Sequence, residues 1–202
     1  MEKFVQKDDR TLRFARLEDA AILREIYAPY IEMPVSFEYE VPSLEEFRKR
    51  IEDRIYTYPY LVLCENDVPF AYAYASRYKE RAAYQWDVEL SVYVKQNVRR
   101  AGAGSILYRA LLELLEMQGV RNAFAIIGYP NEGSKMLHRR FNFRPVGIQY
   151  RAGYKCGAWH DVLIYQREFD NFTHDPQPIV PISEFSWEEI EPVLKRAFEA
   201  IK

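Results

Sequence analysis

Two glycines and two arginines lie close together in the segment 99–104, and their spacing predicts an anion-binding loop. Arg99 and Arg100 precede Gly102 and Gly104, between an apolar run and an amphipathic pattern. Glycines let a ligand approach the backbone, and the unpaired N–H groups of a first helical turn point toward a bound anion. The spacing differs from those of the common nucleoside triphosphate and dinucleotide loops. The alternative is an ordinary strand-to-helix connection with solvated arginines.

A carboxylate, Glu89, lies in the apolar run 88–94 that enters this loop. Strand alternation places Glu89, Ser91 and Tyr93 on one face. A protonated amine cannot act as a nucleophile, and a carboxylate can accept its proton directly or through water. Glu89 is therefore a candidate general base. The alternative is a solvated strand glutamate, because acidic residues are mostly exposed.

Two cations and a phenol lie just upstream of that strand, at Lys79, Arg81 and Tyr84. A guanidinium presents a planar fork that matches a carboxylate or phosphinate, whereas an ammonium acts as a point charge. These residues could hold an anionic substrate. The alternative is a charged surface hairpin, since charge runs are commonly solvated.

Asn131 and His138 are seven residues apart at the start and in the middle of a predicted helix. This spacing is about two turns, so both side chains can face the same ligand. Histidine titrates near neutral pH and could protonate a leaving group. The alternative is a structural histidine.

Hydrophobic periodicity predicts the elements that must position these residues. Strands are expected at 12–17, 61–64, 68–76, 88–94, 123–127, 146–150 and 162–169. Helices are expected from Asp19 until Pro34, from the loop to Gly119, and at 134–141. Another helix is expected to begin at Ser43, which forms a capping box with Glu46. The order predicts a mixed α/β sheet with helices on both faces and a right-handed crossover around the loop helix.

Composition predicts one domain, residues 10–169, and an extension, residues 170–202. The chain has 202 residues, of which 49% are hydrophobic, enough for one substantial core. The extension carries Pro176, Pro178 and Pro181, followed by an amphipathic helix that should dock on the body or on a second subunit.

The net charge, the hydrophobic pattern and the cysteine content argue against several classes of binding partner. A net charge of −2 argues against a nucleic-acid partner. The sequence has no signal-peptide pattern and no run of 18 apolar residues, so we expect a soluble, cytoplasmic protein without a membrane partner. Two cysteines are too few for a disulfide framework or zinc site, so no metal is expected.

The segment 99–104 resembles the pyrophosphate loop of the GNAT superfamily of N-acetyltransferases. The runs 84–93, 125–131 and 153–162 further resemble phosphinothricin N-acetyltransferases and their methionine sulfoximine and sulfone relatives, and the resemblance covers residues 12–169. It implies an α/β fold of GNAT type, with a mixed, mostly antiparallel central sheet, helices on both faces and a C-terminal helical extension. It also implies acetyl-CoA as the co-substrate.

The resemblance assigns site residues by position. It implies acetyl-CoA contacts at Val92, Tyr93, Val94, Arg99, Arg100, Ala101, Gly102, Ala103, Gly104, Ser105 and Asn131. It implies a substrate pocket formed by Phe37, Lys79, Arg81, Tyr84, Glu89, Ser91, Tyr93, Gly128 and Val162. Glu89 falls on the proposed base, and His138 matches a family histidine. The chain departs from the pattern at Cys156, at Asn142 in place of glycine, and in its longer tail.

These observations predict an N-acetyltransferase that modifies the α-amino group of a small anionic amino-acid analogue by direct attack. Either His138 or an ordered water would meet the leaving thiolate. The alternatives are an acetyltransferase for another amine or a peptide N-terminus, and a non-catalytic acyl-CoA sensor. A homodimer is expected, with a monomer as the alternative.

Overall fold

A computed structural model describes residues 3–96, 98, 102–169 and 172–199. Its centre is an eight-stranded sheet in the order β1-β2-β3-β4-β5-β6-β8-β7. Only β5 and β6 pair in parallel among the described strands. The strands are β1 Phe4–Lys7, β2 Arg10–Phe14, β3 Tyr60–Glu65, β4 Val68–Arg77, β5 Asp87–Val94, β6 Asn122–Gly128, β7 Arg144–Lys155 and β8 Ala158–Glu168. The expected mixed, mostly antiparallel sheet is confirmed.

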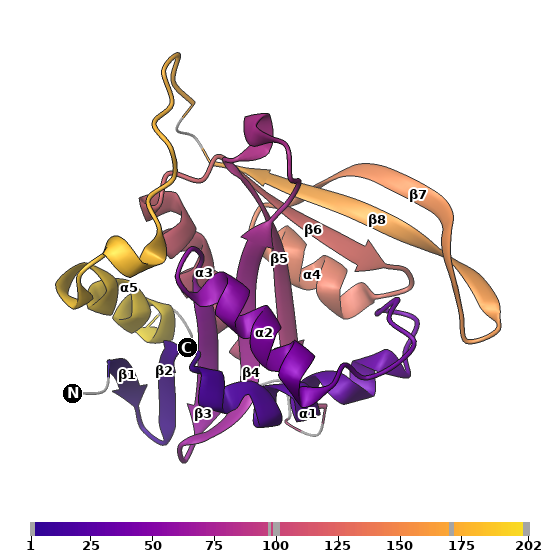
Figure 1. Cartoon of the computed structure of the whole chain (residues 1–202), viewed down its shortest axis with the longest axis horizontal. Helices are drawn as coiled ribbons and strands as arrows, with labels where there is room; N and C mark the ends of the chain where they lie inside the picture. Colours follow the sequence, from indigo (N-terminus) through magenta and orange to yellow (C-terminus); the bar gives the residue numbers. More distant parts are fainter. Residues whose placement is uncertain (1–2, 97, 99–101, 170–171, 200–202) are drawn as a thin grey trace.

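Helices cover both faces of the sheet, as predicted (Figure 1). They are α1 Ala20–Ile31, α2 Leu44–Ile55, α3 Ala103–Met117, α4 Glu132–Arg140 and α5 Trp187–Glu199. Three short 3-10 turns, η1 Leu17–Asp19, η2 Ala82–Tyr84 and η3 Ile182–Glu184, complete the described elements. One buried cluster lies under α1 and α2, and a larger one joins the sheet to α3 and α5. The strand β5 therefore runs between two packed layers.

The signals that begin and end the helices follow the expected chemistry. Ser43 accepts the backbone N–H of Glu46 at 3.2 Å, and the Glu46 carboxylate accepts the backbone N–H of Ser43 at 2.7 Å. Gly119 has a φ of +86° just after α3, where a left-handed residue commonly ends a helix. Asn142 has a φ of +62°, so the asparagine found in place of glycine occupies the left-handed conformation that it tolerates well.

Four strands differ from the prediction. No strand is expected from the sequence at β1, whose four residues include only one buried side chain, Val5. The strand expected at 12–17 is β2, which ends at Phe14 because η1 follows. The strands expected at 146–150 and 162–169 are longer, because β7 and β8 form an extended hairpin. Most of β7 is exposed, so burial leaves little periodic signal there.

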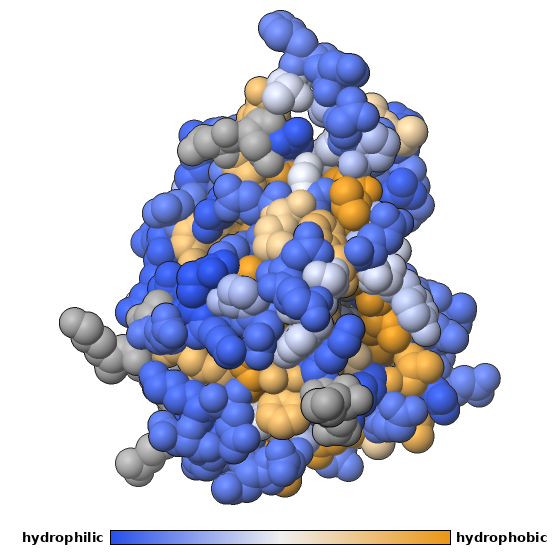
Figure 2. Space-filling model, turned by 90° about the vertical axis from the view of Figure 1, so that its left-hand side faces the viewer, coloured by the Kyte–Doolittle hydropathy of each residue, from blue (hydrophilic) through white to orange (hydrophobic). Residues whose placement is uncertain are grey.

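The C-terminal extension returns to the body. In α5 the side chains of Ile190, Val193, Leu194, Ala197 and Phe198 are buried, and the helix contacts α3 and β1. Figure 2 views the side of the molecule on which α5 and β1 lie, with hydrophilic residues over most of it and hydrophobic groups between them. The open question of where this helix docks is thus resolved in favour of its own chain. Among the described residues, no helix is long and apolar enough to cross a membrane.

Candidate functional site

The site begins where β5 and β6 stop pairing. Their parallel register runs from Asp87 to Glu89 on β5, although β5 continues to Val94. Beyond that point a cavity of about 390 Å³ opens between the two strands. Its walls include Glu89 to Val94 on one side and Ala125 to Gly128 on the other. Where the two strands separate, their facing backbone groups no longer pair with each other. Each of these groups then needs another hydrogen-bond partner, and a ligand can supply one.

A second cavity, of about 190 Å³, lies on the α1 and α2 side of the sheet. Glu89, Ser91 and Tyr93 line both cavities, as strand alternation predicts for three residues on one face. Four tyrosines of α1, β3 and β4 and two arginines of α2 complete much of the wall: Tyr27, Tyr60, Tyr72, Tyr74, Arg50 and Arg54. Glu89 therefore stands at the junction of the two spaces.

The Glu89 carboxyl has an environment suited to proton transfer. Burial raises its pKa above the ordinary value, and the positive charge of Arg54 opposes part of that rise. A carboxylate with a raised pKa is a stronger base toward an ammonium group than a solvated one.

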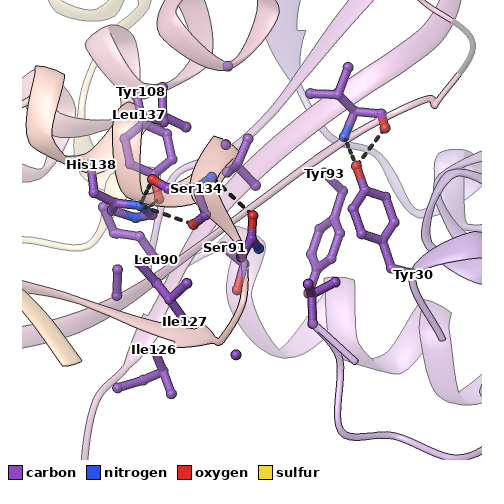
Figure 3. A pocket seen from close by; sticks show the side chains of 18 of the residues that line it. Tyr30, Leu90, Ser91, Tyr93, Tyr108, Ile126, Ile127, Ser134, Leu137 and His138 are labelled. Atoms are coloured by element: carbon purple, nitrogen blue, oxygen red, sulfur yellow. Dashed lines mark hydrogen bonds between the residues drawn. The ribbon is translucent and has the colours of Figure 1, made fainter. Parts of the chain in front are cut away.

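A buried hydrogen-bonded group of His138, Tyr108 and Ser134 forms another part of the cavity wall (Figure 3). The His138 Nδ1 lies 2.8 Å from the backbone oxygen of Ser134, and the His138 Nε2 lies 2.8 Å from the Tyr108 hydroxyl. Because a carbonyl only accepts, Nδ1 carries the proton and Tyr108 donates to Nε2. Burial lowers the pKa of His138 to about 4, and burial also raises the pKa of Tyr108. His138 is thus neutral at physiological pH, with both ring nitrogens engaged.

The predicted anion loop leads into a third cavity, of about 740 Å³, at the N-terminus of α3. Gly102 is the N-cap with a φ of +71°, and a Cβ at Gly104 would meet Leu137 at 3.3 Å. Ala103 and Ser105 also line this space, and Arg140 of α4 donates to the Ser105 hydroxyl at 3.0 Å. Arg99, Arg100 and Ala101 lie outside the described residues.

The α3 cavity and the β5–β6 cavity form one groove, because they share Tyr30, Val94, Gly104, Gly133 and Leu137. A long ligand with a phosphate at one end and a reactive group at the other fits such a groove: the helix N-terminus and Arg140 suit the phosphate, and Glu89 lies at the far end. The residues present therefore fit acetyl-CoA.

Other predicted cofactor residues lie along this groove. Val92 and Tyr93 line the β5–β6 cavity, and the backbone of Val94 binds the Tyr30 hydroxyl, donating at 3.1 Å and accepting at 2.7 Å. Asn131 is the N-cap of α4, where its Oδ1 accepts the backbone N–H of Ser134 at 3.1 Å. The Asn131 amide nitrogen is the part of that side chain that could serve a ligand.

The predicted substrate residues fall into two groups. Ser91 and Gly128 line the β5–β6 cavity with Glu89, and a Cβ at Gly128 would meet the backbone oxygen of Pro34 at 3.0 Å. Val162 is buried beside Gly128, its partner in the β6–β8 register. Phe37 instead packs against Gly153 on the β7–β8 hairpin.

Lys79, Arg81 and Tyr84 gather around η2, and the described chain does not bring them into either cavity that Glu89 lines. The Lys79 Nζ lies 4.8 Å from the centre of the Tyr84 ring. Arg81 is exposed at the start of η2. A single chain therefore keeps this cationic group separate from the candidate base.

The sequence did not single out four residues that the fold brings to the site: Tyr30, Arg54, Tyr108 and Arg140. Tyr108 and Tyr30 sit on apolar helix stripes, where an aromatic is normally core. Arg54 and Arg140 lie in the last turns of α2 and α4. A basic residue at that position is common because its charge interacts favourably with the helix dipole. No local signal in the sequence distinguishes these arginines from solvated ones.

Comparisons with known proteins identify the family of this chain. The family model for the acetyltransferase (GNAT) domain matches residues 12–164. The chain is 38% identical over 177 residues to a phosphinothricin N-acetyltransferase from Streptomyces viridochromogenes, covering 86% of this chain and 94% of that protein. A second phosphinothricin N-acetyltransferase, from Streptomyces coelicolor, is 36% identical over 155 residues, covering 74% and 91%.

A solved structure gives the same result at the level of the fold. The GNAT superfamily phosphinothricin acetyltransferase from Sinorhizobium meliloti, in complex with acetyl-CoA, superposes with a TM-score of 0.78 at 31% identity and covers 85% of this chain and 94% of that one. The chain therefore belongs to the GNAT acetyltransferase family, within the group of phosphinothricin N-acetyltransferases, and is an N-acetyltransferase that uses acetyl-CoA as its acyl donor.

Proposed function

We propose that the enzyme acetylates the α-amino group of a small anionic amino-acid analogue of the phosphinothricin, methionine sulfoximine or methionine sulfone type. The observation that carries this proposal is the position of Glu89 between two cavities. One is continuous with the α3 N-terminus and suits the acyl donor, whereas the other contains cationic and aromatic side chains. The names of the similar enzymes point to the same substrate class.

We assign the donor groove to the backbone of Val92 and Val94, the α3 N-terminus at residues 102–105, and the Asn131 amide. Acetyl-CoA supplies a thioester, whose carbonyl carbon is the electrophile. Arg99, Arg100 and Ala101, which precede Gly102, complete the proposed phosphate loop. Arg140 adds a cation to the described part of this loop. A backbone N–H group in the part of β5 that does not pair with β6, other than that of Val94, which donates to Tyr30, would polarise the thioester carbonyl oxygen.

The substrate ammonium would bind beside Glu89 and lose a proton to its carboxylate, directly or through water. The amine nitrogen then forms a bond to the acetyl carbon and gives its second proton to water, the carbon–sulfur bond breaks, and the electron pair of that bond leaves with the thiolate. No acyl-enzyme forms. The raised pKa of Glu89 supports its part in this step, because proton transfer is most effective when the base and the operating pH are matched.

The geometry favours water, rather than His138, as the proton source for the thiolate. The Nδ1 proton of His138 is bound to Ser134, and Nε2 accepts from Tyr108. With a pKa of about 4, the ring holds no second proton at neutral pH. We therefore assign His138 a positioning role: it holds the Tyr108 ring in the cavity wall.

A substrate panel tests the proposal. Thiol release from acetyl-CoA would be followed with phosphinothricin, methionine sulfoximine, methionine sulfone, ordinary amino acids, spermidine, an aminoglycoside and a peptide with a free N-terminus. Saturable release with the first three compounds is expected. Release confined to the polycations or the peptide would place the activity elsewhere in the superfamily, and silence with acetyl-CoA binding retained would favour an acyl-CoA sensor.

We also propose that the enzyme is a homodimer. Apolar side chains are exposed on the β7–β8 hairpin, at Val146, Ile148, Tyr150, Tyr154 and Trp159. Apolar patches of this kind commonly mark protein contacts. The predicted substrate residues Lys79, Arg81 and Tyr84 do not line the two Glu89 cavities of the single chain. In a dimer, side chains of a second copy could complete the substrate site.

A further inference from the structure

Arg54 occupies the cavity next to Glu89 although it comes from the end of α2. Its guanidinium lies over the Tyr74 ring, with its carbon 5.5 Å from the ring centre. Nη1 donates to the backbone oxygen of Arg50. Tyr74 in turn stacks on Tyr60 with 4.7 Å between ring centres. The guanidinium is therefore held in a fixed place, which reduces the entropy lost when it binds a ligand.

The two arginines of this cavity differ in their partners. Arg50 forms an ion pair with Glu38, with 2.8 Å between Nη1 and Oε1. Arg54 has no ion-pair partner within the described part of the chain, and its Nε is buried without a hydrogen-bond partner there. Arg109 and Arg121 also have a buried Nε without a partner in the described chain, but Arg54 is the one of the three that lines the cavity beside Glu89, where a ligand can supply that partner.

One positive and one negative side chain of this cavity remain without an ion-pair partner among the described residues. After the Arg50–Glu38 pair is set aside, the cavity retains the Arg54 guanidinium and the Glu89 carboxylate. They are close enough for the charge of Arg54 to lower the pKa of Glu89. An α-amino acid zwitterion carries the complementary pair, an ammonium for Glu89 and a carboxylate for Arg54. A guanidinium fork suits a carboxylate because it can donate two parallel hydrogen bonds.

We propose that Arg54 binds the carboxylate of the amino-acid substrate in the tyrosine-lined cavity and thereby turns the substrate amine toward Glu89. This inference rests on the proposed function, and it deepens it by naming the residue that selects an amino acid over a simple amine. It assigns recognition of the carboxylate to α2 rather than to the cationic group around η2. Arg54 is a specificity residue, and Glu89 keeps the role of base.

Binding to the enzyme–CoA complex tests this assignment without depending on turnover. Calorimetry would compare L-methionine sulfone with its carboxamide, which keeps the amine and side chain but lacks the negative charge. In Arg54→Met the Kd for the acid should rise about 10- to 100-fold, the value of a charge-assisted hydrogen-bonded pair, while the Kd for the carboxamide stays nearly constant. Arg54→Lys keeps the charge without the fork and should recover part of the affinity. Arg48→Met removes an exposed arginine from the same helix and is the matched control.

The outcomes separate the two proposals. Equal losses for acid and carboxamide, an unchanged Kd for the acid, or no binding of the acid to the wild type would overturn the role of Arg54. Selective loss for the acid, combined with no thiol release by the wild type, would uphold Arg54 and refute the acetyl transfer proposed for this substrate class. If Arg54→Met does not fold, the preference of Arg54→Lys for the acid over the carboxamide decides the matter.

Discussion

The strength of Glu89 as the proposed base depends on one neighbour, Arg54. Burial raises the pKa of its carboxyl, and the Arg54 guanidinium is the charge that lowers it. Desolvation disfavours a carboxylate, whereas an adjacent cation favours it, so these effects oppose each other at the same oxygen atoms. In the proposed mechanism, the catalytic pH range is therefore coupled to Arg54, which lies in another element.

The coupling predicts a shift in the pH profile. The acid limb of kcat/KM, where activity falls as Glu89 takes up a proton, should move to higher pH in Arg54→Met because the opposing cation is gone. The profile should be measured with the substrate carboxamide, so that the lost carboxylate contact does not enter. Arg48→Met should leave the limb in place. An acid limb that is the same in wild type and Arg54→Met would contradict the coupling.

His138 gives a prediction about stability. Histidine titrates near 6.5 when unfolded, and burial lowers its pKa in the folded protein to about 4. Between these pH values the unfolded chain binds more protons, so the free energy of unfolding falls as the pH drops from 6.5 toward 4. The loss from this group is ~3 kcal/mol. Urea unfolding at several pH values should show a flatter dependence in His138→Gln, and identical slopes would contradict the buried, neutral imidazole.

Among the helices and strands, the features that depend on residues close together in the sequence could be predicted from the sequence. The capping box at Ser43, the glycine at 119 and the alternation of Glu89, Ser91 and Tyr93 each depend on neighbours in sequence, and the structure has all three. The position of Arg54 depends instead on how α2 packs against α1 and β3, which brings its guanidinium over Tyr74 of β4. Its sequence pattern is that of any basic residue near a helix C-terminus, so only the fold distinguishes it.

The helix α5 shows the same limit. Its apolar stripe predicts docking, but the partner surface is α3, about seventy residues earlier, and the pattern of one helix does not specify the surface that covers it. The strand β1 has only one buried residue, so its sequence shows no alternation of apolar and polar side chains that would predict a strand. The β7–β8 arms are exposed, so backbone pairing rather than burial sets their length.

The docking of α5 predicts a cost for opening its interface. Leu194 is fully buried in the cluster that joins α5 to α3 and the sheet. Leu194→Ala should lower the free energy of unfolding by about 2–5 kcal/mol, through lost burial and a residual cavity. Lys195→Ala changes the exposed face of the same helix and should cost at most ~1 kcal/mol. Equal, small effects in urea unfolding would mean that α5 is not part of the folded body in solution.

At the scale of the whole molecule, the proposed homodimer can be tested through the β7–β8 hairpin. Ile148 is 48% exposed on β7, and a lysine there would place a charge within the proposed contact. Sedimentation should give a mass of two chains for the wild type and one for Ile148→Lys. Lys49→Glu, on the exposed face of α2, is the control and should remain a dimer. A monomeric wild type would contradict the assembly.

The proposed mechanism depends most on Glu89 as the proton acceptor in direct acetyl transfer. The decisive measurement is kcat of Glu89→Gln at neutral pH, with saturating acetyl-CoA and methionine sulfone, beside calorimetric binding of acetyl-CoA. Turnover is expected to fall about 10²- to 10⁴-fold, the usual contribution of a general base, while acetyl-CoA binding stays nearly intact. Unchanged turnover in a variant that binds acetyl-CoA normally would contradict the proposed mechanism.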